Sequence, residues 1–389
     1  MKGAIAGMSV VLALAAAAPA AAQDPFVIQT GTDDTRLVFG LTTQLDGRFS
    51  LDDPAPITNT FTIRKARPTL SGRVAKYFDF KVMPDFGNGT AVLLDAYFDI
   101  RFSPKFRVRS GKDKTPVGYE LLMGDGYLPF PERALPSSLV PNRDVGIQAQ
   151  GDLAGGKVSY SAGVFNGVPD GTSSTADVDA NNGKDVAGRV VYRGPQGFGV
   201  HVGGSTGTQA GALPAFRTSV GQTYFSYLTG VAAGGRRSRF TPAVFYYRKA
   251  FGAFAEFVRS DQTVTKSGVL TDLGHHGWGV TGSVVLTGEA ASDRGIRPKN
   301  AFDPAAGHWG ALQILARYST LKIDPLTFTN GLAAAGASPD AASFTVAANW
   351  YPAAYIKYYL TFERTTFGAG ATDTRKAEHV VLFRTQLSF

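Results

Sequence analysis

Apolar and polar residues alternate along much of this chain. In residues 94–102 the apolar side chains take every second position, and mostly charged side chains take the positions between them. Residues 312–319, 344–350 and 356–363 repeat the pattern, with Leu315 as an apolar intruder on the polar side of the first of them. A period of two with one apolar face is typical of a strand that lies between two different solvents.

Seventeen segments of the chain are candidate strands on this criterion. A closed barrel with both termini on one side needs an even number of strands, so we expect one segment too many or one missed. A tilted spanning strand needs about 9–11 residues, and the chain length then fits sixteen strands and their connections. The candidate strands begin near Arg36, Asn59, Tyr77, Ala91, Lys105, Arg143, Lys157, Asp185, Gly197, Gln222, Arg239, Gly252, His275, His308, Ala341, Ala354 and Glu378.

A soluble β-sandwich or β-helix would also alternate, but two features favour a membrane barrel. Aromatic residues such as Phe102, Trp350 and Phe362 lie on the apolar faces near strand ends, as an interfacial girdle would. The polar faces carry charged side chains at successive positions, which suits a wet lumen rather than a dry core. We therefore predict an all-β protein, a transmembrane antiparallel β-barrel of sixteen strands, because closure leaves no backbone group unsatisfied in lipid.

Both ends of the chain indicate export. Residues 1–22 have a positive start, an apolar run over 4–18 and a cleavage site after Ala22, which together are typical of a secretory signal peptide. An uncleaved anchor is the alternative, but the apolar run is short. The barrel would then occupy residues 23–389, and its final alternating strand, which ends at Phe389, resembles the insertion signal of bacterial outer-membrane proteins. The predicted location is the bacterial outer membrane.

Composition excludes several kinds of chemistry. The chain has no Cys, which removes disulfides, cysteine-ligated metals and a cysteine nucleophile. It has only five His, and His275 with its neighbour has no partner at ligand spacing, so we predict no metal and no cofactor. The formal net charge is +8, but the basic residues are dispersed along strands rather than grouped, which argues against nucleic acid. No catalytic set is visible, and we predict that the protein is not an enzyme.

Residues 112–142 form a long gap between two predicted strands. The gap holds five Pro and no sustained alternation, and connections of this length are usually functional or disordered. We expect it to fold into the lumen as a constriction loop, with an external solvated loop as the alternative. It would bring Lys112, Lys114 and Arg133 to the pathway, with Asp113, Asp125 and Glu132 as counter-charges.

Basic residues on the strands would complete an anion path. Arg107 and Arg109 share the polar face of one strand, whereas Arg64, Lys65 and Arg67 cannot all face one way unless a bulge near Pro68 re-aims some of them or Lys65 snorkels to the interface. The alternative role is pairing of Arg64, Arg67 and Arg101 with Asp95, Asp99 and Asp79 to stiffen the wall. The predicted pore-lining and anion-binding residues are Arg64, Lys65, Arg67, Asp95, Arg101, Arg107, Arg109, Lys112, Lys114 and Arg133.

The first half of the chain contains short motifs that resemble those of one known family and occur in the same order. They are residues 61–72, which include Ile63-Arg64-Lys65-Ala66-Arg67, and then residues 77–81, 85–87, 94–97, 111–120, 132–136, 142–146 and 163–167. Over residues 59–170 the chain resembles the phosphate-selective porin O and P family. The resemblance implies a sixteen-stranded trimeric barrel whose basic pore favours anions. Selective members of that family narrow the pore with a lysine cluster on the inward loop, where this chain offers only Lys112 and Lys114.

The expected function is therefore passive diffusion of small hydrophilic solutes through an outer-membrane porin. We expect a preference for small inorganic or organic anions, with phosphate or polyphosphate as candidates, and no nucleic-acid partner. A homotrimer follows from the resemblance alone, and outer-membrane lipid is the expected surroundings. Two alternatives from other classes are a nonconducting structural or adhesion barrel of the cell envelope and an outer-membrane barrel hydrolase.

Overall fold

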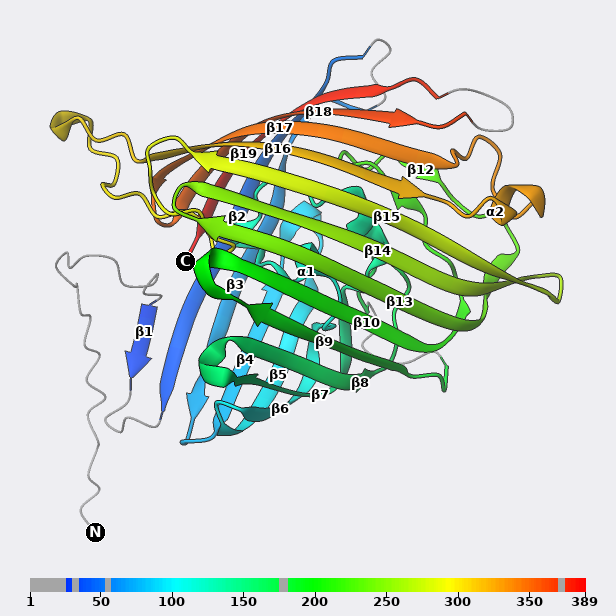
Figure 1. Ribbon diagram of the computed structural model, residues 1–389, viewed down its shortest axis with the longest axis horizontal. Helices are drawn as coiled ribbons and strands as arrows, with labels where there is room; N and C mark the ends of the chain where they lie inside the picture. The colour runs from blue at the N-terminus through cyan, green and yellow to red at the C-terminus, as the bar shows by residue number, and fades with distance from the viewer. Residues whose placement is uncertain (1–25, 30–34, 53–56, 175–180, 370–374) are drawn as a thin grey trace.

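The protein is a closed antiparallel β-barrel in the computed structural model, which describes residues 26–29, 35–52, 57–174, 181–369 and 375–389 (Figure 1). Each wall strand pairs with the next along the chain, and β19 pairs back with β2 to close the sheet. The predicted signal peptide, residues 1–22, lies outside the described residues. None of the helices in the described part is long and apolar enough to cross a membrane.

Sixteen strands of the described chain form the wall. They are β2 (Arg36–Ser50), β3 (Thr60–Val74), β4 (Phe78–Asp85), β5 (Val92–Ser103), β6 (Phe106–Lys114), β7 (Arg143–Leu153), β8 (Val158–Phe165), β9 (Asp185–Arg193), β10 (Phe198–Gly211), β13 (Val231–Arg248), β14 (Phe251–Lys266), β15 (Val269–Val285), β16 (Ala311–Lys322), β17 (Asp340–Ala353), β18 (Ile356–Phe367) and β19 (Glu378–Ser388). The predicted sixteen-stranded barrel is confirmed.

The surplus candidate strand is the one expected near Gln222. There the chain forms β12 (Thr223–Phe225), which pairs only with β11 (Phe216–Arg217) in a small sheet inside the β10–β13 connection. Strands β13 and β15 begin at Val231 and Val269, several residues before the predicted starts. The early part of β13 is a run of small Ala and Gly residues, whose side chains give no alternating signal.

The two faces of the wall follow the predicted alternation. On β18 the exterior residue Leu360 is 57% exposed, whereas its interior neighbours Tyr359 and Thr361 are buried. The apolar intruder Leu315 points into the barrel, where it packs with Ala347 against a phenylalanine of the interior chain described below. A lumen-facing apolar residue on a barrel strand therefore marks a position that another segment covers.

The two ends of the barrel differ in their connections. At the end that holds the C-terminus, hereafter the turn end, most connections are short, but residues 286–310 between β15 and β16 are an exception (Figure 1). At the opposite end, hereafter the loop end, most connections are long. Phe389 exchanges two backbone hydrogen bonds of 3.0 Å with Leu41. Beyond that point β1 (Phe26–Gln29) takes over the same edge of β2, pairing with residues 36–39.

Residues 115–142, hereafter the inner loop, lie inside the barrel (Figure 1). The loop contains α1 (Tyr119–Leu122) and 3-10 turns at Asp125–Tyr127 and Leu135–Leu139. Its apolar side chains share one cluster with Phe216, Tyr224 and Phe225 of the β10–β13 connection, which also enters the barrel. The inner loop begins at Thr115 rather than at Lys112, because β6 extends to Lys114.

Candidate solute pathway through the barrel

The first half of the inner loop is bound to the wall at β13 and β14. The ring of Tyr119 stacks on Phe245 of β13 with centroids 5.0 Å apart. The backbone amides of Tyr119 and Glu120 donate to the carboxylate of Glu256 on β14, at 2.6 and 3.1 Å. A buried loop must satisfy its backbone polar groups, and here a side chain of the wall does so.

The second half of the inner loop is bound through its carbonyls to polar side chains of β17, β18 and β19. The Leu128 carbonyl accepts from the Lys357 ammonium at 2.8 Å and from the Tyr359 hydroxyl at 3.1 Å. Asn349 donates to the Pro129 carbonyl at 2.8 Å. Phe130 then covers the intruder Leu315 and receives Arg317 over its ring. Much of the polar lumen face in this sector therefore anchors the loop.

Glu132 of the inner loop is held by three arginines from the wall. Its carboxylate is 2.7 Å from Arg48, 2.9 Å from Arg64 and 3.3 Å from Arg384. Burial by itself would raise the pKa of Glu132, but these guanidinium groups hold that pKa well below its usual range. The side chain is therefore charged at neutral pH and fastens the loop to β2, β3 and β19.

Asp125, the first residue of the 3-10 turn Asp125–Tyr127 in the inner loop, is also held by three cations. Its carboxylate is 3.2 Å from Lys65 and 2.8 Å from Arg133, and it also pairs with Arg67. Burial would raise its pKa, but Lys65 and Arg133, with further help from nearby cations, hold the pKa well below its usual range. Arg67 is shared with Asp85, whose carboxylate lies 2.6 Å away.

Two large cavities lie on opposite sides of the inner loop. The loop-end cavity measures about 840 Å³ and the turn-end cavity about 860 Å³. The charged side chains that line the loop-end cavity are Arg48, Arg64, Glu132, Arg133, Asp170, Arg217, Arg317 and Glu363. Those that line the turn-end cavity are Arg67, Lys81, Asp95, Arg109, Asp113, Lys114, Asp125, Arg143, Arg294 and Arg297.

The boundary between the cavities runs through neighbouring residues of one chain. Leu121 borders the loop-end cavity and Leu122 the turn-end cavity, and no described residue lines both. Arg133 lines the loop-end cavity, Asp125 lines the turn-end cavity, and their ion pair joins the two sides. Any solute that crosses the barrel here must pass the inner loop at this boundary.

The sequence-predicted site residues are divided between several locations. Arg64 and Arg133 line the loop-end cavity, and Arg67, Asp95, Arg109 and Lys114 line the turn-end cavity. Lys65, Arg101, Arg107 and Lys112 line neither cavity. Lys65 is buried against Asp125, and the Lys112 ammonium donates to the Ser174 carbonyl at 2.8 Å.

The bulge in β3 lies at Arg64 rather than near Pro68. Gln44 of β2 pairs with Lys65, but the next residue, Leu45, pairs with Ile63, so Arg64 is the extra residue. The bulge points Arg64 at Glu132, while Lys65 and Arg67 both reach Asp125. The alternative that Lys65 snorkels to the interface is wrong, because its ammonium pairs with Asp125 inside the barrel.

Several of the predicted pore-lining cations are paired along the wall. Arg109 bonds both oxygens of Asp99 at 2.7 Å, pairs with Asp113, and stacks 3.6 Å from the Tyr97 ring centroid. The carboxylate of Asp95 pairs with two cations, Arg143 at 2.6 Å and Lys81 at 2.7 Å.

Farther toward the turn end, Arg101 lies 3.9 Å from Asp79, and Arg107 donates to Gln150 at 3.3 Å. The wall-stiffening alternative therefore holds for Arg101 with Asp79, whereas Arg64 and Arg67 use other acids.

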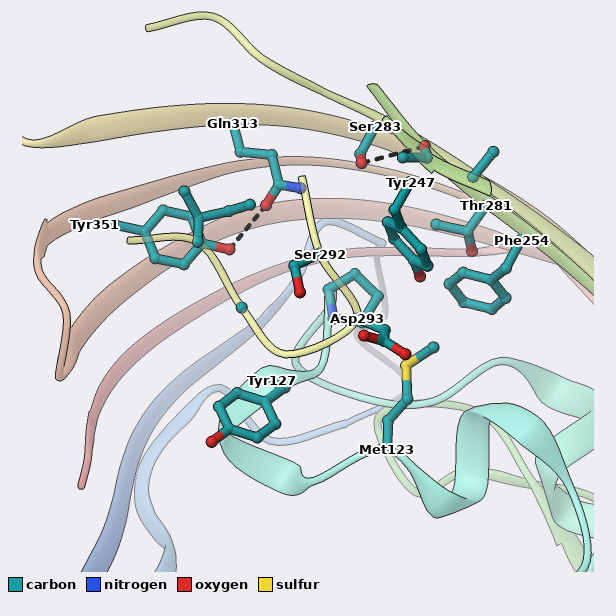
Figure 2. A pocket seen from close by; sticks show the side chains of 15 residues that line it. Met123, Tyr127, Tyr247, Phe254, Thr281, Ser283, Ser292, Asp293, Gln313 and Tyr351 are labelled. Atoms are coloured by element: carbon teal, nitrogen blue, oxygen red, sulfur yellow. Dashed lines mark hydrogen bonds between the residues drawn. The ribbon is translucent and has the colours of Figure 1, made fainter. Parts of the chain in front are cut away.

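Sequence reasoning missed the contribution of residues 286–310. Figure 2 shows Ser292 and Asp293 of this connection facing Met123 and Tyr127 of the inner loop, below a 2.7 Å hydrogen bond from Tyr351 to Gln313. Within the connection, Ile296 is buried against Val285, Ala311 and Tyr351.

The same connection places two further arginines, Arg294 and Arg297, at the turn-end cavity. No periodic pattern in the sequence marks a connection that folds inward. The apolar Ile296 within a polar stretch is the one feature that indicates a buried position in this connection.

Comparisons with known proteins agree with this geometry. A search of curated proteins finds no match. Three solved structures share the fold: an anion-selective porin from Comamonas acidovorans (TM-score 0.61, 10% identity, 91% of this chain and 100% of that one), the outer membrane channel DcaP of Acinetobacter baumannii (0.58, 10%, 93% and 99%) and the outer membrane protein OmpT of Vibrio cholerae (0.57, 12%, 92% and 98%).

At the level of sequence, the family model of phosphate-selective porin O and P matches residues 40–389, far beyond the segment that carries the motifs. With a closed barrel, an apolar exterior and a charged lumen, the chain belongs to the phosphate-selective porin O and P family and is a bacterial outer-membrane channel.

Proposed function

We propose that this channel passes small anions by diffusion. The observation that carries the proposal is the charge of the turn-end cavity, where seven Arg or Lys side chains stand against three Asp. Cavities lined by one sign of charge between low-dielectric walls raise the local concentration of the opposite ion. The loop-end cavity has a smaller excess of cationic side chains. An anion that enters from the loop end would therefore meet a more positive potential after it passes the inner loop.

The chemistry of the lining suits oxoanions and halides that exchange quickly. Guanidinium and ammonium groups replace hydration water with charge-assisted hydrogen bonds. Their partial neutralisation by Asp95, Asp99 and Asp113 keeps each site weak, and a permeating ion must be able to leave as well as enter. In this proposal Arg64, Arg67, Arg109, Lys114 and Arg133 face the path, and Lys65 reaches it through Asp125.

Phosphate is one proposed solute rather than an exclusive one. The inner loop, residues 115–142, contains no Lys, and Arg133 is its one basic residue. The inner loop therefore lacks the lysine cluster expected of selective members, and in this proposal arginines from the wall supply most of the positive charge. We propose a general preference for small inorganic and organic anions, with phosphate among them.

Assembly as a homotrimer in outer-membrane lipid is also part of the proposal. The exterior carries large exposed apolar side chains, including Phe61 at 78% and Phe98 at 66% exposure, which need lipid or a second subunit as cover. Chemical crosslinking of the detergent-solubilised protein, followed by mass measurement, tests the number of subunits.

Planar-bilayer recording tests the function directly. The refolded protein is placed under a KCl gradient, and phosphate is then added on one side. Stepwise openings with an anion-favouring reversal potential support the proposal, and a cation-favouring potential contradicts it. Block of the chloride current by micromolar phosphate would make phosphate the preferred solute.

A nonconducting barrel is the second candidate, because the two cavities have no lining residue in common. A folded barrel, identified by its resistance to unfolding in cold detergent, that never conducts would favour this candidate. The same recording therefore separates the two.

A further inference from the structure

We propose that the Asp125 carboxylate is a tethered anion that occupies the cation site between the two cavities, and that a permeating anion must replace it there. This inference rests on the proposed function. Its starting observation is that Lys65 and Arg67 of β3 and Arg133 of the inner loop converge on one carboxylate. Such a cluster offers an oxoanion the same donors that it offers Asp125.

The position of Asp125 makes its occupancy matter for transport. The ion pair with Arg133 joins a residue of the turn-end cavity to a residue of the loop-end cavity. Lys65 has Asp125 as its one ion-pair or hydrogen-bond partner in the described chain. When the carboxylate turns away, Lys65 therefore presents an unpaired charge at the boundary, and an incoming anion is the group that can neutralise it.

The backbone around Asp125 is fixed independently of its side chain. Gln386 donates to the Gly126 carbonyl at 2.8 Å, and Gln44 approaches the Asp125 carbonyl at 3.4 Å. A Cβ atom at Gly126 would come within 2.5 Å of the Ser388 hydroxyl, so the loop is pressed against β19 there. Displacement of the carboxylate thus requires a side-chain rotation, not movement of the whole loop.

Position, rather than the number of partners, distinguishes Asp125 from Glu132. Both carboxylates touch three cations, and each shares a buried arginine with a second acid: Arg384 stays bonded to Asp46, and Arg67 to Asp85, both at 2.6 Å. Glu132 and its partners Arg48 and Arg64 line the loop-end cavity alone, whereas Asp125 lines the turn-end cavity and pairs with Arg133 of the loop-end cavity. Glu132 also has its own carbonyl bound by Arg317 at 2.9 Å. Glu132 therefore joins the loop to the wall, whereas Asp125 fills a site at the boundary.

The test compares two substitutions of one ion pair. In the wild type, the short side chain holds the Asp125 carboxylate at the cation site at an effective concentration of about millimolar or more. Asp125→Asn removes this competing carboxylate, so phosphate should block the chloride current at about tenfold lower concentration. In Lys65→Gln the site loses a cation, and phosphate block should weaken about tenfold. A purely structural ion pair would shift both variants in the same direction.

Asp79→Asn is the matched control, because it makes the same chemical change on a residue that lines neither cavity. Its phosphate block should equal that of the wild type. Unchanged block in Asp125→Asn, or changes of the same sign in Asp125→Asn and Lys65→Gln, would overturn the inference. A wild-type channel without anion preference would instead overturn the proposed function.

Asp125→Cys gives a second route that does not depend on comparing separately folded variants. The chain has no other Cys, so a thiol reagent modifies this position alone. An anionic sulfonatoethyl reagent applied to an open channel should restore the wild-type block, and a neutral reagent of equal size should not. Equal effects of the two reagents would contradict a role for the charge.

Discussion

The ammonium of Lys357 on β18 donates a 2.8 Å hydrogen bond to the main-chain carbonyl of Leu128 in the inner loop. The lysine is buried, and its charge lies 4.0 Å from the centroid of the Tyr359 ring. A cation on the lumen face of a barrel strand would ordinarily be assigned to the ion path. Here it anchors a loop, and the distinction has measurable consequences.

Lys357→Gln should loosen the inner loop without changing ion selectivity. Loss of a hydrogen bond from a charged donor to a buried carbonyl costs about 1.5–3 kcal/mol of stability. We expect a lower urea midpoint of unfolding and more current noise at an unchanged reversal potential. Lys322→Gln, at an exposed strand end, is the control and should match the wild type in all three. A shifted reversal potential in Lys357→Gln would instead place this residue in the path.

Glu132→Gln should destabilise the barrel in a pH-dependent way. Because the pKa of the folded carboxylate is depressed below its ordinary value of 4.5, its ion pairs are fully present above that value and are lost as pH falls through the folded pKa. The stability gap to the wild type should be about 2–3 kcal/mol, constant from pH 8 to pH 5, and should shrink below about pH 4.5. Urea unfolding at several pH values measures it. A gap that narrows between pH 7 and pH 5 would contradict this account.

Arg109→Gln should lower the anion preference of the channel. The substitution leaves Asp99 and Asp113 without their guanidinium partner beside the turn-end cavity, so the local potential becomes more negative. We expect the reversal potential under a KCl gradient to move toward the cation side. Arg101→Gln is the comparison, since Arg101 lines neither cavity, and its effect should be smaller. Arg109→Glu is a poorer test, because three carboxylates would then share one site and disturb folding.

Replacing Arg294 and Arg297 together by Gln should make the current more asymmetric in voltage. Both residues line the turn-end cavity, so they raise the anion concentration at one mouth of the channel. Chloride current that enters from the turn end should fall more than current that enters from the loop end. Arg248→Gln, an exposed arginine at the same end, serves as the control. Equal loss in both directions would indicate an effect deeper in the barrel.

The sequence predicted the wall better than it predicted the interior. Period-two alternation is a local signal, and it located the sixteen wall strands because each faces lipid on one side and polar groups on the other. The bulge at Arg64 was placed wrongly, since a bulge is a relation between β3 and the register of β2. Asp125 and Glu132 were recognised as counter-charges, but their partners come from strands far away in the sequence.

The division of cations between path and anchor could not be predicted for the same reason. The sequence pattern places Arg384 and Arg64 alike on lumen-facing sides of their strands. The inner loop covers Arg384, which is buried, and leaves Arg64 beside the loop-end cavity. The inward course of residues 286–310 is set by tertiary packing of Ile296, which leaves no periodic trace.

Strands β1 and β19, the first and last of the described chain, occupy consecutive stretches of one edge of β2. β19 ends where Phe389 bonds Leu41, and β1 runs in the same direction and pairs with residues 36–39. Residues appended after Phe389 would extend along β2 into the stretch that β1 holds. An affinity tag fused to the C-terminus would therefore compete with β1 for its hydrogen bonds, whereas a tag inserted in the exposed hairpin between β14 and β15, at Ser267 and Gly268, would leave this edge intact.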